Sequence, residues 1–121
     1  MSLMNVRLEL GRTRDAPEGD RRHGYEFIAP LDRHGHLDTA EWRAAKDRCG
    51  VRCFRPSRAD RKGMLHHLGH GWRFDYEPGP DGEPIFHLDR HIIAPGLYIS
   101  ITEEDGVQRP FKVVAVTPVK P

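Results

Sequence analysis

The chemistry that this sequence suggests first lies between residues 49 and 70, where two cysteines and two histidines follow one another. Cys49, Cys53, His66 and His70 form the pattern C-x3-C-x12-H-x3-H. Two thiolates and two imidazoles can complete a tetrahedral shell around Zn²⁺. Arginines flank the first pair and offer contacts to phosphate. These residue types at this spacing are therefore typical of a structural zinc site.

The spacing resembles that of two-Cys, two-His zinc fingers, and the resemblance implies zinc-dependent nucleic-acid binding. A finger places its histidines one turn apart on a helix, yet Pro56 and Gly63 lie in the segment that would form it. The alternative is a hairpin in which residues 64–68 turn through Gly69-His70-Gly71 into residues 72–76 and align three aromatic rings on one face. We adopt the hairpin, predict no metal site, and keep the zinc-dependent nucleic-acid binder as the first alternative.

The sequence supplies few other reactive groups in a usable arrangement. Cys49 lies at the C-terminus of the predicted helix, where the helix dipole raises the pKa of a thiol. Cys53 has arginine neighbours but no readable partner, and His34 and His36 are expected in an exposed loop. Neither a phosphate-binding loop nor a dinucleotide motif is present. We predict a small non-enzymatic binding module with no catalytic residues and no cofactor.

A second alternative comes from the C-terminal third of the chain. Pro95-Gly96-Leu97-Tyr98-Ile99-Ser100-Ile101, followed by Arg109-Pro110-Phe111-Lys112, resembles the flavin-barrel segment of ferredoxin reductases. The resemblance implies an arginine on phosphate and an aromatic ring on the flavin. In this chain Phe111 and Lys112 stand where that family has tyrosine and serine.

Over its whole length the chain resembles a small bacterial family of unknown function. The resemblance rests on residues 23–31, 72–76 and 95–116. It implies no activity, ligand or site residue.

Charge is unevenly distributed although the formal net charge is only +1. Residues 43–62 hold eight basic and two acidic side chains, whereas residues 77–108 hold seven acidic side chains and one arginine. We expect solvated surfaces, with Arg52, Arg55 and Arg58 as a candidate anion-binding patch. Opposite patches also favour self-association as a homodimer, or a protein partner, over nucleic acid.

One helix is well signalled, over residues 38–49. Asp38 can cap its first turn, Glu41 can bond back to the cap, and Gly50 is the expected stop. Trp42 is the expected anchor onto the rest of the protein. The other segments favour strands: 6–10, 25–29, 51–55, 64–68, 72–76, 85–88, 97–103 and 109–117.

These elements predict a single domain over residues 4–121, with residues 1–3 as a cloning remnant. The expected fold is mainly β (α+β), an antiparallel barrel-like or half-barrel sheet of about six to seven short strands with one docked helix. A three-residue loop with Gly106 left-handed would place Ile101 opposite Arg109 and Ile99 opposite Phe111. No apolar run is long enough to span a membrane and no secretion signal is present, so we expect a cytoplasmic protein.

Overall fold

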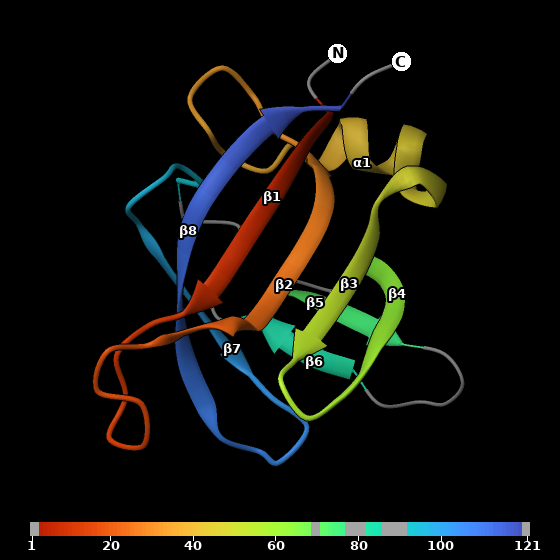
Figure 1. The fold of residues 1–121 in the computed structure, drawn as a ribbon. Helices are drawn as coiled ribbons and strands as arrows, with labels where there is room; N and C mark the ends of the chain where they lie inside the picture. Colours follow the sequence, from red (N-terminus) through yellow and green to blue (C-terminus); the bar gives the residue numbers. More distant parts are fainter. Residues whose placement is uncertain (1–2, 69–70, 77–81, 86–91, 120–121) are drawn as a thin grey trace.

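The computed structural model describes residues 3–68, 71–76, 82–85 and 92–119, which form a mainly β, antiparallel barrel with one helix (Figure 1). Each strand pairs with the next one along the chain, and the last pairs with the first, so the sheet closes. The expected barrel-like fold is confirmed, with eight strands among the described residues. They are β1 (Leu3–Leu10), β2 (Asp20–Pro30), β3 (Gly50–Arg55), β4 (Arg58–Leu68), β5 (Gly71–Tyr76), β6 (Gly82–Ile85), β7 (Tyr98–Thr102) and β8 (Gln108–Pro118).

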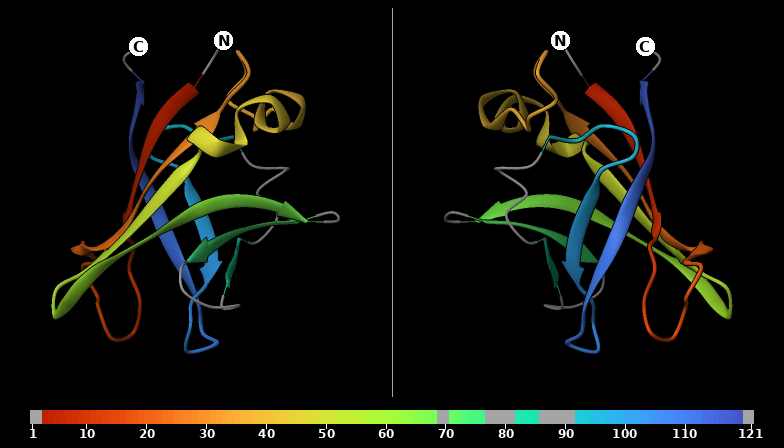
Figure 2. Two further views of the ribbon diagram at one scale, coloured as in Figure 1. Left: turned by 90° about the vertical axis from the view of Figure 1, so that its right-hand side faces the viewer. Right: turned by 90° about the vertical axis from the view of Figure 1, so that its left-hand side faces the viewer.

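The helix lies at the end of the barrel where the two termini also lie (Figures 1 and 2). Helix α1 (Thr39–Ala45) continues into a 3-10 turn, η1 (Lys46–Arg48). The predicted Asp38 cap is confirmed, because its carboxylate accepts a hydrogen bond from the Glu41 amide at 3.1 Å. The expected bond from the Asp38 amide back to Glu41 is wrong, because this amide donates to the Pro30 carbonyl at 2.9 Å. Trp42 is buried and its Nε1 donates to the Leu65 carbonyl at 3.1 Å, which anchors this short helix to β4. Within the described residues, no helix is long and apolar enough to cross a membrane.

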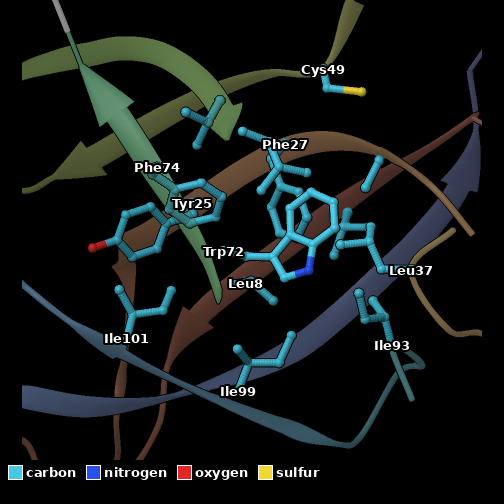
Figure 3. Packing of buried hydrophobic residues seen from close by; sticks show 14 of the residues in the cluster. Leu8, Tyr25, Phe27, Leu37, Cys49, Trp72, Phe74, Ile93, Ile99 and Ile101 are labelled. Atoms are coloured by element: carbon cyan, nitrogen blue, oxygen red, sulfur yellow. The ribbon is translucent and has the colours of Figure 1, made fainter. Parts of the chain in front are cut away.

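The interior of the barrel is filled by side chains from alternate positions of the strands, as expected for an eight-stranded barrel (Figure 3). Tyr25 packs against Phe74 and Phe111, with ring centroids 5.2 and 5.0 Å apart. Phe27 and Phe74 are also in contact, at 5.1 Å. The Tyr25 hydroxyl points away from Trp72 in Figure 3, so the aromatic core has one polar end.

The predicted hairpin is formed by β4 and β5, which pair from Gly63 opposite Tyr76 to Leu68 opposite Gly71. Its aromatic face is confirmed, because Trp72, Phe74 and Tyr76 are all buried. The expected turn at residues 69–70 lies outside the described residues. So do residues 86–88 of the strand predicted at 85–88, and β6 reaches Ile85.

Strand β4 pairs with β3 along its first part and with β5 along its second part. Gly63 lies in the short overlap, where β4 pairs with both strands. The pairing with β3 extends as far as Met64 opposite Gly50, and the pairing with β5 runs from Gly63 onward. A Cβ atom at Gly63 would come within 1.9 Å of the Asp75 carbonyl oxygen. Only glycine therefore fits at position 63, because any Cβ there would collide with the backbone of β5.

The predicted register of the last hairpin is confirmed. Ile101 pairs with Arg109 and Ile99 pairs with Phe111. Gly106 has a φ of +82°, which is the left-handed conformation that the three-residue loop requires. This register sets which side chains of β7 and β8 face the interior.

Candidate functional site

The end of the barrel opposite the termini gathers the β1–β2, β3–β4 and β7–β8 connections (Figures 1 and 2). We call it the loop end. A polar layer of side chains lies there on top of the apolar core, and a cleft opens on the outer wall beside it.

The polar layer is built around one buried carboxylate. Glu103 is 3% exposed. Its carboxylate accepts hydrogen bonds from the Tyr25 hydroxyl at 2.6 Å, from Arg55 Nη2 at 3.0 Å and from Arg109 Nη1 at 3.1 Å. His23 Nε2 lies 2.9 Å from the same carboxylate. We call Glu103, His23, Tyr25, Arg55 and Arg109 the Glu103 cluster.

Strand alternation explains why these side chains meet. Along β7 the inward-facing positions are Ile99 and Ile101, and Glu103 is the next position in that series. The other members likewise follow or precede inward-facing apolar residues of β2, β3 and β8. The cluster therefore continues the side-chain layers of the core by one step, with charged and polar groups in place of apolar ones. The sequence analysis did not predict the cluster. Continuing the alternation of inward-facing positions one step past each apolar run would have identified its members.

The electrostatics of the cluster hold Glu103 in its charged form. Burial by itself raises the pKa of this carboxyl, but the hydrogen bonds from His23 and Tyr25 and the charge of Arg55 outweigh it, so the pKa lies below its ordinary value. A carboxylate in this state accepts hydrogen bonds but has no proton to donate at neutral pH. The arrangement suits a structural ion-pair network better than a general acid.

Glu104 extends the network toward the surface. Its carboxylate contacts Arg58, lies 2.8 Å from Arg61 Nη1 and 3.7 Å from Arg55 Nη1. Asp105 pairs with Arg109 at 2.9 Å. The basic stretch around residue 55 and the acidic stretch around residue 104 therefore meet within one molecule, which removes much of the charge that motivated self-association.

The structure separates the three arginines of the candidate anion patch. Arg52 lies on the outer wall, where it pairs with Glu26 and Asp60 and its guanidinium stacks on the Phe54 ring at 5.0 Å. Arg55 and Arg58 instead pair with Glu103 and Glu104 at the loop end. Each of the three already has a carboxylate partner, and ligand binding by this patch stays an untested prediction.

The two cysteines of the zinc pattern are likewise held apart on the backbone. Cys49 is buried and its Sγ donates to the Ala45 carbonyl at 3.5 Å. The extended backbone of residues 50–53 carries the two cysteines roughly 13 Å apart. His66 lies on β4, His70 is outside the described residues, and the described side chains contain no group of three or more potential metal ligands.

The geometry also bears on the reactivity of Cys49 and on the flavin-barrel resemblance. Burial raises the pKa of the Cys49 thiol to about 11, so the direction that the helix end predicted is correct but the main cause is desolvation. Phe111 is fully buried in the core, and Arg109 is engaged by Glu103 and Asp105. Neither side chain is placed as the flavin-barrel resemblance implies.

A cleft of about 860 Å³ lies on the outer wall next to the loop end, between the β1–β2 connection and β8. Its lining includes Arg12 and Arg21 from the two sides of the connection, Lys112 and Val114 from β8, and Tyr98 from β7. Arg12, Arg21 and Lys112 are exposed, and none of them forms an ion pair with any residue that the structure describes. These three basic groups remain available to an external anion.

Comparisons with known proteins found no match: no family model, no curated protein and no solved structure aligns with this chain. This agrees with the expected resemblance to a family of unknown function. Function is therefore inferred from the geometry of the loop end.

The Glu103 cluster makes the stability of the protein sensitive to acid. Because the pKa of Glu103 in the folded state lies below its ordinary value of 4.5, the unfolded chain takes up the proton first as the pH falls. Asp105 behaves in the same way, since its hydrogen bond with Arg109 lowers its pKa to about 2. We expect the free energy of unfolding to fall as the pH drops from about 4.5 toward about 2.

Urea unfolding of the wild type and of Glu103→Gln over a pH series checks this expectation. The difference in stability between the two proteins should narrow with acidification, because glutamine cannot titrate. A difference that stays constant down to about pH 2 would contradict the assigned role of Glu103.

Proposed function

We propose that the protein is a non-enzymatic binding module that holds an anionic ligand in the cleft beside the loop end. The observation that carries the proposal is the set of three exposed basic groups, Arg12, Arg21 and Lys112, around one cleft without carboxylate partners among the described residues. Unpaired cations that face a concave surface concentrate anions there. Arg52, Arg55 and Arg58 contribute less, because neighbouring carboxylates already neutralise them.

A binding role is favoured over catalysis by the state of the reactive groups. The Glu103 carboxylate is charged and enclosed by donors, and the pKa of the Cys49 thiol is far above neutrality. Neither group is prepared for proton transfer or nucleophilic attack at neutral pH. The cleft itself has Tyr98 and cations in its lining, which suit recognition of a ligand.

The proposal also covers the cellular compartment, the source and the partners of the protein. We propose a cytoplasmic protein of bacterial origin, in which both cysteines remain reduced. A homodimer or a complex with another protein is the second proposal, and it would use surfaces other than the internally paired charges at the loop end.

Calorimetric titration with inorganic pyrophosphate at low ionic strength tests the proposal. We expect binding that weakens as salt is added, and that weakens at least ten-fold in the double variant Arg12→Gln/Lys112→Gln. The matched control is Arg43→Gln/Lys46→Gln, which removes two exposed cations from the helical segment α1–η1. Equal affinities in the two double variants, or no binding by the wild type, would refute the proposed site.

A further inference from the structure

We propose that the ligand of this cleft is a mononucleotide, whose base lies on the Tyr98 ring and whose phosphate lies among Arg12, Arg21 and Lys112. The inference rests on the proposed anion binding and adds that the ligand also carries a nucleobase. It is carried by the position of one exposed aromatic side chain among cations.

Tyr98 is placed as a platform at the edge of the cleft. It faces outward from β7, opposite Lys112 in the register with β8, and is 50% exposed. The Tyr98 ring also packs against the backbone at Gly11, where a Cβ atom would come within 2.9 Å of the ring carbon Cε2. The ring is thus supported from within the protein while half of the side chain stays open to solvent. Exposed aromatic rings held in this way are the usual stacking partners of nucleobases.

The surroundings of Tyr98 match the two halves of a nucleotide. Val114 is 37% exposed and adds an apolar side chain to the lining of the same cleft. Lys112 lies directly across the strand pair from Tyr98, and Arg12 follows Gly11 in the chain. A planar base on Tyr98 therefore places an attached phosphate within the set of unpaired cations. Phosphate oxygens accept hydrogen bonds from both guanidinium and ammonium groups.

The acidic groups of the cleft limit the length of the ligand. Glu9 pairs with Arg7 and Asp20 pairs with Arg22, but Glu18 has no ion-pair partner among the described residues. These three carboxylates line the same cleft and would repel a continuing run of phosphates. A volume of about 860 Å³ lies in the range of small-molecule sites. Both observations favour a single nucleotide over a nucleic-acid strand.

Calorimetry with adenosine monophosphate, adenosine and inorganic phosphate tests the inference. We expect the monophosphate to bind at least ten-fold more tightly than either half alone. Tyr98→Ala should weaken the monophosphate about ten-fold or more and leave inorganic phosphate unchanged, while Tyr98→Phe keeps the affinity. Lys112→Gln should weaken both the monophosphate and the phosphate. Arg43→Gln is the control for an unrelated exposed cation, and circular dichroism verifies that each variant is folded.

The possible outcomes separate this inference from the proposed function. If pyrophosphate binds through Arg12 and Lys112 but Tyr98→Ala binds adenosine monophosphate as the wild type does, the nucleotide is refuted and the anion site stands. If neither pyrophosphate nor the monophosphate binds, both fail. If a ten-residue single-stranded oligonucleotide binds more tightly than the monophosphate, with a steep salt dependence, the ligand is a nucleic-acid strand and the inference is wrong.

Discussion

Replacing Glu103 with glutamine is expected to lower the free energy of unfolding at neutral pH by about 3 kcal/mol. The substitution keeps the shape of the side chain but leaves Arg55 and Arg109 facing a neutral group inside the loop end. Removing one member of a buried ion pair typically costs about 3 to 5 kcal/mol. We expect the lower value because the side chains of Arg55 and Arg109 are 17% and 23% exposed, so water can partly solvate them.

The matched control is Glu104→Gln, which changes the adjacent carboxylate. The Glu104 side chain is 33% exposed and its two nearest partners, Arg58 and Arg61, are 43% and 29% exposed, so its loss is expected to cost about 1 kcal/mol or less. Urea or guanidinium unfolding of the three proteins measures both effects. Equal losses for the two variants would show that burial of the Glu103 cluster does not determine its contribution to stability.

The second large effect is expected at the bend of β4. Gly63→Ala should destabilise the barrel by about 3 kcal/mol or more, because the new Cβ would lie 1.9 Å from the Asp75 carbonyl oxygen and 2.7 Å from its carbonyl carbon. Backbone atoms cannot rotate away as a side chain can. Relief therefore requires β4 and β5 to separate at the hydrogen bonds around Gly63 and Tyr76.

Gly50→Ala supplies the comparison, because Gly50 lies on β3 opposite Met64, beside the same bend. A Cβ at Gly50 would meet its nearest atom, the Gly63 carbonyl oxygen, at 3.7 Å, which is an ordinary contact. This variant should stay within about 1 kcal/mol of the wild type. Thermal or chemical unfolding distinguishes the two variants, and a Gly63→Ala protein as stable as Gly50→Ala would contradict the close approach of β5.

Local patterns in the sequence were sufficient for the features that depend on neighbouring residues. The Asp38 cap, the aromatic face of β5 and the register around Gly106 all follow from spacings of a few residues. The fold class followed from the number of short extended segments and from the presence of a single helix. The closing pair, β1 with β8, joins the two ends of the chain, which no local pattern specifies.

The Glu103 cluster shows why the site was harder to predict. Its hydrogen bonds join residues that are far apart in the sequence, from His23 to Glu103 and from Arg55 to Glu103. The sequence displayed a density of arginines near position 55, but it did not indicate which carboxylates would reach them. The candidate patch was therefore placed where arginines are frequent. The cleft cations Arg12, Arg21 and Lys112, which have no ion-pair partner among the described residues, lie instead in and around the β1–β2 connection and on β8.

Closure of the sheet between β1 and β8 also bears on how the protein is made. Val6 and Leu8 find their partners Val116 and Val113 only after all of the intervening strands have been synthesised. Until then the first strand carries an open edge that can pair with another nascent chain. The pairing of β1 with β8 joins residues that are far apart in the sequence. Folds dominated by such non-local contacts form in milliseconds to seconds. The concentration of newly made chains, more than the stability of the finished barrel, then governs how much protein escapes aggregation.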